Sequence, residues 1–538
     1  MNIGRLSRDN IRRFGEYEYL YFEGKWYTNV ERERNSNKLG RALKNLGIKK
    51  GDRVGLQIPN HPRFIESFLA IVKIGAVVVP FSPLIRGSDL SHIYRDSEMV
   101  ATIGDGNYIG TMKEAKKEAP NLKQIILIDE VKIPGTLSYD ELIKNQSDDL
   151  EIEDTDNGDL ATILYTGGTT GIPKGVMHDH FAHYSHCLSY FEAWTDLASE
   201  NLKTIEQKYD RKTGKWHEIT RNIFGIDRSQ IYLHVLPFGH TFGLSKMHLE
   251  YYMGRKIILM KWWNAEEAMK SIDQFKVTDL VAVPTMFVQM LDHPNADKYD
   301  LSSLQYVVCG GAPLPQEIVD AWKAKYGLTI SNGYGITEAC GANIAHLPLL
   351  PIKTGSIGKV NHKHTMVKIC DEQGNEVPRG RLGELVLKGP IIMKGYLNMP
   401  NETAKVLKNG WLHTGDICCM DEEGYLFIKE RKSDLIIRGG ENVYPTEVET
   451  ILYSHPKVKE AAVVPVANRT YGEEIGAWIA LKEGAEATEE EIIEFCKGKL
   501  PTYKRPKYVG FMNTLPKSIV GKILRKELKG LKFPEQTK

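Results

Sequence analysis

Residues 160–175, LATILYTGGTTGIPKG, place a glycine-rich loop directly after a short apolar run that is typical of a buried β-strand. From Tyr165 to Gly175 the chain contains four glycines, three threonines and one lysine. Ordering such a loop costs conformational entropy and buries little apolar surface, so a ligand is needed to offset the cost. Backbone N–H groups, threonine hydroxyls and Lys174 together make an anion site. We therefore predict a phosphate-binding loop; a Gly/Thr-rich β-hairpin is the alternative.

The loop matches neither of two common nucleotide-binding signatures. A P-loop has the pattern GxxxxGK[ST] and runs into a helix, but here Gly175 follows Lys174, so the hydroxyl that would bind magnesium is missing. The dinucleotide-binding pattern GxGxxG is not present in the loop either. The sequence thus predicts a third kind of phosphate site.

The same order of strand and loop recurs through the first two-thirds of the chain. Short apolar runs end in Gly, Pro or Asp and alternate with helical stretches, as in DRVGLQIPN (52–60), VVVPFSP (77–83), YLHVLPFG (232–239) and YVVCGGAP (306–313). This alternation predicts an α/β fold with parallel sheets that are covered on both faces. Ligands of such folds bind beyond the carboxyl ends of the strands, so we expect these loops to converge on one crevice.

The chain of 538 residues is too long for a single core, so we predict two or more domains. Residues 1–430 form the predicted N-terminal domain. Its last part, about 354–430, consists of short strands and turns and reads as a β subdomain. Residues 435–538 are α+β and form a second domain, joined through residues 431–434. The polar segment 200–230 is expected to be a surface hairpin; a lid or an oligomer contact is the alternative.

Composition and charge disfavour several classes of protein. The net charge of +1 does not indicate nucleic-acid binding, which requires clustered basic charge. No run of about 18 apolar residues predicts a membrane span, and the N-terminus lacks the apolar core of a signal peptide. The seven cysteines show no zinc-binding spacing and are interpreted as reduced thiols. We expect a cytoplasmic protein, and an oligomer is compatible with the sequence.

The stretch HDHFAHYSH (178–186) carries four histidines. His180, His183 and His186 are three residues apart and would share one helix face, a spacing that suits a metal. No carboxylate or thiolate accompanies them on that face. We interpret them as a polar helix face rather than as a metal site.

An ordered set of motifs extends the opening loop along nearly the whole chain. YTGGTTGIPKG is followed by LPFGHTFG, GGAPL, NGYGITEA, GSIGK, GYLN, WLHTGD, RKSDLIIRGGENVYP and LPKSIVGKILR. The set resembles the adenylate-forming superfamily, which includes acyl-CoA synthetases, adenylation domains of peptide synthetases and firefly-type luciferases. The resemblance implies a large N-terminal domain of two parallel αβα-layered sheets with a β-barrel-like subdomain, and a small mobile α+β C-terminal domain.

The resemblance also implies a reaction in two halves. A carboxylate attacks the α-phosphate of ATP and releases pyrophosphate, and a thiol, usually that of coenzyme A, then displaces AMP from the acyl-adenylate. Both halves move negative charge and need fixed donors and cations, among them Mg²⁺. We expect an AMP-forming acid:CoA ligase. A stand-alone enzyme that loads a carrier protein is the main alternative, and a non-catalytic nucleotide-binding protein is a remote one.

The resemblance assigns roles to the residues at the matching positions. Lys522, from the small domain, would lie between the carboxylate and the α-phosphate, where a mobile ammonium suits two anions. Thr337 would bond the α-phosphate and Glu338 would hold Mg²⁺. Tyr334 would lie against the adenine, and Asp416 would accept hydrogen bonds from the ribose. Further ATP or AMP contacts are implied for Thr166, Gly167, Gly168, Thr169, Thr170, Lys174, Gly310, Gly311, Ala312, Asn332, Gly333, Gly335 and Arg431.

Taken singly, these residues have plainer interpretations. Glu338 could lie in the first turn of a helix over EACGANIAH (338–346). Asp416 follows an ordinary turn, and Lys522 lies near a lysine-rich C-terminus where a solvated charge is common. Only the ordered set of motifs favours the functional assignment.

His240 resembles the histidine or aromatic residue that gates the carboxylate site in this family, while a strand-end histidine is the alternative. Gly310 and Gly333 suggest a deep acyl pocket, which Met286 and Phe287 could close. No candidate is acidic, which disfavours an amino acid and favours a fatty, hydroxy or aryl acid. The expected pocket residues are His240, Thr241, Met286, Phe287, Gly310, Gly333 and Cys340.

In the family the small domain rotates between the two half-reactions, moving the Lys522 position out and the GGENVYP loop in. This sequence departs from the family at the hinge, where Ser433 stands in place of a common Asp or Lys and Asp434 follows. Either residue could be the pivot. The loop expected to admit coenzyme A contains Gly439, Gly440 and Glu441.

Overall fold

The computed structural model describes residues 2–129, 133–156, 158–166, 172–192, 230–312, 314–347, 351–360, 364–518 and 522–534. Residues 167–171 of the expected phosphate loop lie outside the described residues, among them the expected ATP contacts Gly167, Gly168, Thr169 and Thr170. Apart from Gln230, the same holds for segment 200–230.

The first large sheet has a parallel centre and antiparallel edges. Its nine strands run in the spatial order β16 (Lys359–Val360), β15 (Gly341–Ala345), β14 (Ser331–Ile336), β13 (Tyr306–Cys309), β12 (Asp279–Ala282), β10 (Ile231–His234), β11 (Lys256–Leu259), β1 (Glu18–Phe22) and β2 (Lys25–Thr28). The pairs from β14 through β1 are parallel. The strands β2, β15 and β16 pair antiparallel with their neighbours.

The second large sheet is built in the same way. Its eight strands are β19 (Gly395–Tyr396), β9 (Lys174–Asp179), β8 (Leu160–Thr166), β4 (Val77–Pro80), β3 (Arg53–Gln57), β5 (Ala101–Gly104), β6 (Gln124–Leu127) and β7 (Leu137–Ser138). Only β8–β9 and β9–β19 are antiparallel. The two expected parallel sheets are thus present, and each is mixed because strands at its edges pair antiparallel. The loop between β8 and β9 is too short for a crossover of about a dozen residues, which a parallel pair requires.

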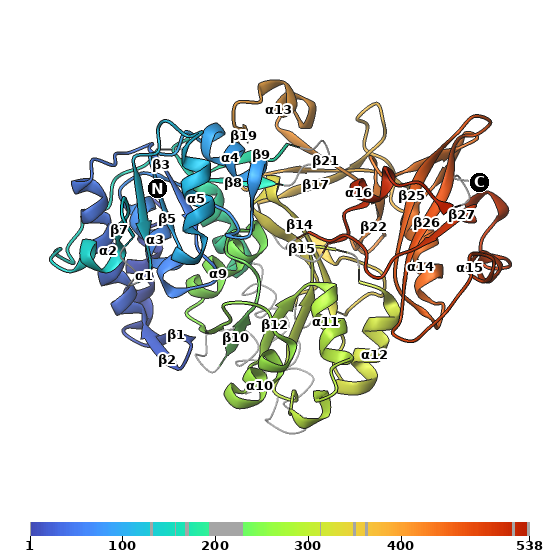
Figure 1. The fold of residues 1–538 in the computed structure, drawn as a ribbon, viewed down its shortest axis with the longest axis horizontal. Helices are drawn as coiled ribbons and strands as arrows, with labels where there is room; N and C mark the ends of the chain where they lie inside the picture. The colour runs from blue at the N-terminus through green and yellow to red at the C-terminus, as the bar shows by residue number, and fades with distance from the viewer. Residues whose placement is uncertain are drawn as a thin grey trace.

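Helices lie on both large sheets and also between them (Figure 1). One hydrophobic core joins the two sheets, since it contains Val54 of β3, Phe68 of α3, Leu233 of β10 and Leu244 of α9. The helices of this part are α1 (Arg5–Phe14), α2 (Asn29–Asn45), α3 (Pro62–Lys73), α4 (Gly87–Asp96), α5 (Ile109–Lys116), α6 (Tyr139–Ile143), α9 (Thr241–Tyr252), α10 (Ala265–Phe275), α11 (Pro284–Leu291) and α12 (Gln316–Tyr326).

Helix α3 illustrates how local sequence fixes these elements. The His61 side chain accepts a hydrogen bond from the Arg63 N–H and caps the helix, while Pro62 occupies its first turn. Gly75, with a φ of 72°, lies just beyond the last turn. Every residue of the helix except Arg63 is buried. The loop before the helix, residues 58–61, follows directly from the end of β3.

The chain after Glu338 differs from the sequence prediction. Instead of a helix over residues 338–346 it forms a short 3₁₀ turn, η3 (Thr337–Ala339), followed by β15. Cys340 and Gly341 have φ values of 57° and 115°, which reverse the chain and end the helical turn. A Cβ on Gly341 would collide with the Ser245 side chain, so glycine is required there.

Two smaller units complete the fold. A five-stranded antiparallel sheet contains β17 (Met366–Cys370), β18 (Gly383–Lys388), β20 (Leu407–Lys408), β21 (Trp411–Met420) and β22 (Leu426–Arg431), with α13 (Pro400–Val406) beside it. Two strands of the expected 354–430 subdomain, β16 and β19, belong instead to the large sheets.

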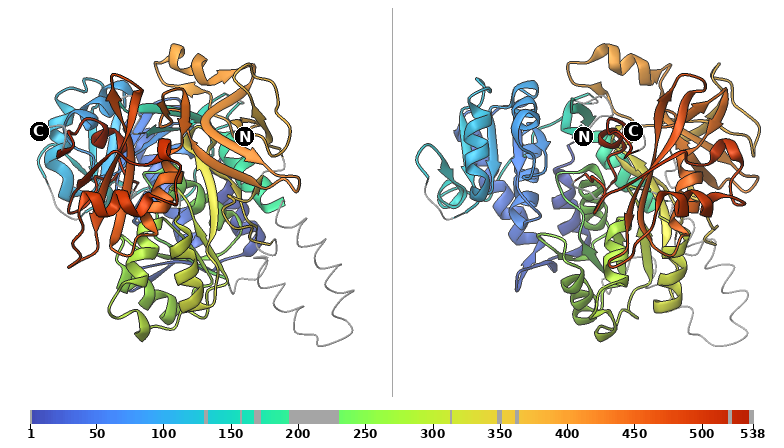
Figure 2. Two further views of the ribbon diagram at one scale, coloured as in Figure 1. Left: turned by 90° about the vertical axis from the view of Figure 1, so that its right-hand side faces the viewer. Right: turned by 45° about the vertical axis from the view of Figure 1, so that its right-hand side comes forward.

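The last unit has cores of its own, separate from the core of the large sheets. It lies on the opposite side of the molecule from the N-terminal helices (Figures 1 and 2). Its elements are β23 (Ile436–Arg438), β24 (Glu441–Val443), α14 (Pro445–Tyr453), β25 (Val458–Asn468), β26 (Gly472–Leu481), α15 (Glu489–Cys496), β27 (Tyr508–Phe511) and α16 (Arg525–Lys529). Across the described residues of the whole chain, none of the helices is long and apolar enough to cross a membrane.

Candidate active site

The described ends of the phosphate loop belong to the β8–β9 hairpin. Thr166 closes β8 and is the cross-strand partner of Lys174, the first residue of β9. Lys174 Nζ lies 2.7 Å from Glu402 Oε2 and 5.1 Å from the centre of the Tyr396 ring. The backbone is thus a hairpin, and its lysine is paired with a carboxylate that an incoming phosphate would have to replace or share.

Tyr334, Asp416 and Arg431 form one group between β14 and the β21–β22 pair, joined by a hydrogen bond and an ion pair. Tyr334 Oη donates to Asp416 Oδ2 at 2.5 Å, and Arg431 Nε lies 3.1 Å from Asp416 Oδ1. Burial raises the pKa of Tyr334 and the Asp416 carboxylate raises it further, so the phenol remains a neutral donor. Both oxygens of the carboxylate expected to bind ribose therefore already have partners.

Thr337 and Glu338 lie in η3, directly after β14. His178 Nε2, on β9, is 2.7 Å from the Thr337 carbonyl oxygen. Burial lowers the pKa of His178 to about 4, so its neutral ring donates the Nε2 proton to that carbonyl. Tyr396 Oη donates to Glu338 Oε1 at 2.8 Å. These contacts fix the turn against the strand that carries Lys174.

Lys522 reaches this group from the small domain. Burial and, after it, the Arg431 charge lower the pKa of Lys522 to about 8, while the Asp416 carboxylate opposes them. Burial lowers the pKa of His240 to about 4, and the charge of Lys522 adds to that effect. Lys522 is therefore close enough to Arg431, Asp416 and His240 for their charges to interact, although these residues are far apart in the sequence.

The contact that the structure shows for His240 is that of a helix cap. It precedes α9, and its Nδ1 accepts a hydrogen bond from the Phe242 N–H at 3.2 Å, which caps the helix. Because the ring is neutral near pH 7 and Nδ1 is an acceptor, Nε2 carries the proton. His240 is thus a structural cap that keeps one N–H available for a substrate oxygen.

The backbone expected beside the adenine belongs to two inner strands of the first large sheet, β13 and β14, and to the loop after β13. Gly310, Gly311 and Ala312 follow β13, and β14 runs parallel to it. Gly311 has a φ of 81°, a conformation that glycine adopts without strain. The Asn332 carbonyl oxygen lies 3.3 Å from His346 Nδ1. This contact helps to fix the backbone of β14. Both Gly311 and Gly335, the latter on β14, are exposed.

Protein side chains occupy the space beside the two glycines that were expected to deepen the acyl pocket. A Cβ on Gly310 would lie 2.8 Å from the Phe242 ring. A Cβ on Gly333 would lie 3.3 Å from a methyl carbon of Val308. Phe242 is a candidate pocket residue that the sequence analysis missed, although it lies within the LPFGHTFG motif.

The other expected pocket residues are divided between a cavity and the core. Phe287 is fully buried and packs edge-on against Trp322, and Thr241 is buried in the first turn of α9. Cys340 is buried with its Sγ 3.4 Å from His183 Nδ1. Met286, by contrast, lines a cavity.

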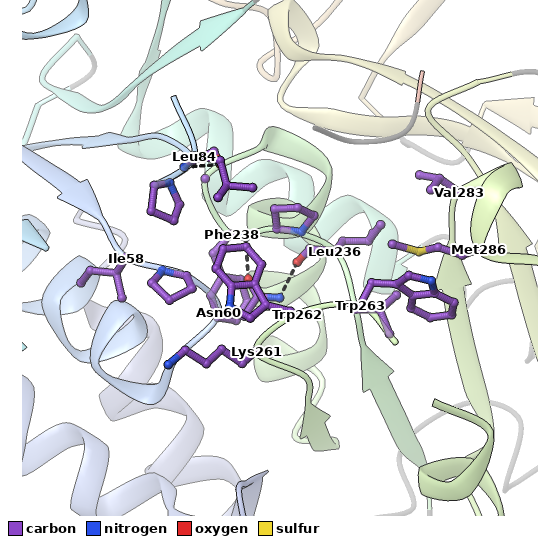
Figure 3. Close-up of a pocket in the computed structure, with 16 residues that line it drawn as sticks. Ile58, Asn60, Leu84, Leu236, Phe238, Lys261, Trp262, Trp263, Val283 and Met286 are labelled. Atoms are coloured by element: carbon purple, nitrogen blue, oxygen red, sulfur yellow. Dashed lines mark hydrogen bonds between the residues drawn. The ribbon is translucent and has the colours of Figure 1, made fainter. Parts of the chain in front are cut away.

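This cavity, of about 110 Å³, lies where the loops after β3, β4, β10 and β11 meet the start of α11 (Figure 3). Figure 3 shows Met286 and Trp263 on the opposite side from Ile58. Three of the four loops that were expected to converge line this cavity, namely those that follow β3, β4 and β10, whereas Gly310, Gly311 and Ala312 after β13 are not part of its lining. The lining is mainly apolar and includes Trp262, which the sequence analysis also missed. The loop segments that line it are 58–60, 82–84, 235–239 and 261–263.

The expected hinge residues and the expected coenzyme A loop differ in their surroundings. Asp434 Oδ1 lies 3.1 Å from Lys529 Nζ, whereas the Ser433 side chain is exposed and its carbonyl accepts from the same lysine at 3.3 Å. The loop forms the turn between β23 and β24 and is exposed. Its glycines have φ values of 60° and 88°. The loop residues are Gly439, Gly440 and Glu441.

The histidines of residues 178–186 are not a polar surface. His180, His183 and His186 are each at most 2 % exposed. His183 Nε2 lies 2.8 Å from Thr162 Oγ1, and His180 Nδ1 accepts a hydrogen bond from the Ile3 N–H. The polar helix face that was expected is therefore buried in the protein and is not exposed to solvent. Imidazoles are small enough to be buried when strands and the N-terminal segment supply their hydrogen bonds.

Comparison with known proteins identifies the family. The model of "AMP-binding enzyme" matches residues 7–397, and that of "AMP-binding enzyme C-terminal domain" matches residues 447–522. A long-chain-fatty-acid–CoA ligase of Bacillus subtilis is 33% identical over 97% of this chain and 93% of its own. A 4-coumarate–CoA ligase of Solanum tuberosum is 34% identical over 94% and 88%. The structure of ATP-bound MatB from Rhodopseudomonas palustris superposes with a TM-score of 0.85 at 26% identity, covering 98% of both chains. The chain belongs to the AMP-binding enzyme family and is an AMP-forming acid:CoA ligase that acts through an acyl-adenylate.

Proposed function

We propose that Lys522 promotes adenylation by lying between the substrate carboxylate and the α-phosphate of ATP. The observation that carries this proposal is the position of Lys522, which comes from the small domain and shares its electrostatic surroundings with Arg431 and Asp416. With a pKa of about 8 the ammonium form prevails at pH 7, and an arriving phosphate would stabilise that form further. The charge offsets the repulsion between two anions as they approach.

The neighbouring residues would hold the nucleotide around this point. Thr337 and Arg431 would bond the α-phosphate, and Tyr334 and Asp416 would receive the nucleoside. Lys174 would take the leaving pyrophosphate, since a hairpin tip with a lysine at its base suits a mobile anion. His240 would direct its Nε2 proton toward the substrate carboxylate and so orient it without acting as a base.

Glu338 suits the role of magnesium ligand. Its carboxylate is half-buried in a fixed turn, and one oxygen, Oε1, accepts from Tyr396, which leaves Oε2 for a hard cation. Mg²⁺ commonly binds through one or two carboxylates together with substrate phosphates. When bound, the ion would neutralise charge on the phosphates.

For the second half-reaction, we propose that residues 435–538 rotate about Ser433 and Asp434 as one domain, against residues 1–430. That motion would withdraw Lys522 and bring the exposed Gly439–Gly440 turn to the acyl-adenylate, where backbone without side chains leaves room for the coenzyme A arm. The hinge carbonyl and carboxylate that Lys529 binds would be released or re-formed during the motion.

The cavity supports an apolar acyl group. Trp262, Trp263 and Met286 in its lining would favour a fatty or aryl acid over an amino acid. One relative is named a long-chain-fatty-acid–CoA ligase and another a 4-coumarate–CoA ligase, so we propose a fatty or an aryl acid as the substrate. The chain is proposed to work in the cytoplasm. Its seven cysteines are free, and six of them are buried, which fits a reducing compartment.

The decisive experiment measures pyrophosphate release and acyl-AMP formation over a panel of fatty, hydroxy and aryl acids, with and without coenzyme A. We expect one acid class to give acyl-AMP, and turnover to require coenzyme A. Lys522→Ala should lose acyl-AMP formation by at least about 10²-fold while keeping thioester formation from supplied acyl-AMP. Equal loss in both halves would contradict the role of Lys522. Turnover only with a carrier protein would favour the carrier-loading alternative.

A further inference from the structure

The segment of residues 393–403 contacts both Lys174 and Glu338, although neither is near it in the sequence. It begins beside β19, which pairs antiparallel with β9 (Figure 1). The Lys394 N–H donates to the Met177 carbonyl at 2.8 Å, and the Leu397 N–H donates to the Gly175 carbonyl at 2.7 Å. The segment is thus fastened along the strand whose first residue is Lys174.

The same segment holds Glu338 at two points. The Met393 N–H donates to the Glu338 carbonyl oxygen at 2.8 Å. Tyr396 Oη donates to Glu338 Oε1, also at 2.8 Å, and Tyr396 is only 8 % exposed. Backbone and carboxylate of Glu338 are therefore both fixed by one short piece of chain.

The far end of the segment returns to Lys174. Thr403 Oγ1 accepts from the Tyr396 N–H at 2.9 Å and donates to the Met399 carbonyl at 2.9 Å, which closes the turn before α13. A Cβ on Gly395 would lie 2.8 Å from Thr403, so glycine lets this side chain approach. The preceding residue, Glu402, forms the 2.7 Å ion pair with Lys174.

We propose that the 393–403 segment sets the spacing between the pyrophosphate lysine and the magnesium carboxylate, with Tyr396 as the positioning residue for Glu338. The inference rests on the proposed roles of Lys174 and Glu338. The phenol fixes the carboxylate rotamer and occupies one oxygen, so that the other faces the cation. Carboxylates that bind metals are commonly oriented by such outer hydrogen bonds.

Tyr396→Phe tests the inference because it removes only the O–H. The readout is Mn²⁺ binding in the presence of ATP, which is measured as the loss of the electron paramagnetic resonance signal of the free ion. We expect binding about tenfold weaker than in the wild type, the lower end of the effect of removing an outer hydrogen bond. The metal concentration for half-maximal acyl-AMP formation should rise in parallel, while the rate at saturating metal changes much less.

Tyr139→Phe is the matched control. Tyr139 Oη also donates to a buried glutamate, Glu66 Oε2, at 2.7 Å, but in α6 and outside the site. The Tyr139→Phe variant should leave Mn²⁺ binding unchanged. Thr403→Val loosens Tyr396 without altering the ring, and it should weaken Mn²⁺ binding in the same direction. Thr403→Val keeps the proposal testable if Tyr396→Phe does not fold.

A double-mutant cycle with Glu338→Gln completes the test. If Tyr396 acts through Glu338, Tyr396→Phe should have almost no further effect on Mn²⁺ binding in the Glu338→Gln background. A wild type that forms acyl-AMP, with Tyr396→Phe binding Mn²⁺ as the wild type does, overturns the positioning role and leaves the proposed function intact. A wild type that forms no acyl-AMP with any acid overturns the proposed function and this inference with it.

Discussion

At the scale of single residues, the lowered pKa of Lys522 predicts how adenylation depends on pH. Under the proposed role of Lys522 its protonated form is the active one, and its pKa of about 8 lies below the usual lysine value because of burial and Arg431. The kcat/KM for acyl-AMP formation should therefore be level near pH 7 and fall above about pH 8, since this parameter reports the free enzyme. Pyrophosphate release between pH 6 and 10 measures it. Lys522→Arg, which stays charged, should remove the alkaline fall even if it is slower; a fall that persists would assign the titration elsewhere.

The ion pair of Lys174 with Glu402 gives a second prediction at this scale. Under the proposed role of Lys174, pyrophosphate competes with the carboxylate for the lysine. Glu402→Gln should therefore strengthen product inhibition by pyrophosphate, by at most about fivefold for a pair worth up to ~1 kcal/mol. Asp140→Asn, which breaks the 2.7 Å pair with Arg63 elsewhere, is the control. Weaker inhibition in Glu402→Gln would mean that the carboxylate mainly positions the lysine.

At the scale of elements, the turn from η3 into β15 depends on Gly341. Its φ of 115° and the nearby Ser245 side chain leave no room for a Cβ. Gly341→Ala should destabilise the fold by about 1–3 kcal/mol and lower the melting temperature in calorimetry. Gly110→Ala, in α5 with nothing within 4 Å of a new Cβ, should leave the melting temperature unchanged or slightly raised. Equal melting temperatures for both variants would contradict the strain.

The sequence predicts those elements whose signals are local. β-branched runs that end in glycine or proline correctly marked β3, β10 and β13, and the ordered motifs indicated the family. The antiparallel edges were missed because pairing direction depends on loop length and partner strand, as between β8 and β9. The contacts of Tyr396 with Glu338, and of Phe242 with Gly310, join residues 58 and 68 positions apart, and no local pattern reports such contacts.

At the scale of the whole molecule, Glu430 connects the large domain to the small one. The Thr446 N–H, at the start of α14, donates to Glu430 Oε2 at 2.9 Å, and Arg525 Nη1 lies 3.6 Å from Oε1. Arg525 also pairs with Glu449 and Asp434. Glu430→Gln removes the charge that the large domain offers to Arg525, so it should favour the rotated arrangement. We expect acyl-AMP formation to slow about fivefold, the effect of losing roughly 1 kcal/mol, while thioester formation from supplied acyl-AMP is kept or improved. Single-turnover rates of each half measure this.

Glu447→Gln is the control for the domain contact. Glu447 pairs with Lys504, and both residues belong to the small domain, so the variant should change neither half-reaction. A parallel slowing of both halves in Glu430→Gln would indicate a general loss of stability and contradict a role in domain orientation.

Lys522 and the Gly439–Gly440 turn belong to the same small unit, which has its own cores. Under the proposed roles they cannot both contact the acyl-adenylate at once, because a rigid domain can place only one of them in the active site at a time. Kinetic order then follows from mechanics: pyrophosphate should depart before the thiol can react. Coenzyme A that is present before adenylation should therefore not speed the reaction. The acyl-adenylate, a mixed anhydride, should stay bound until the small domain has rotated.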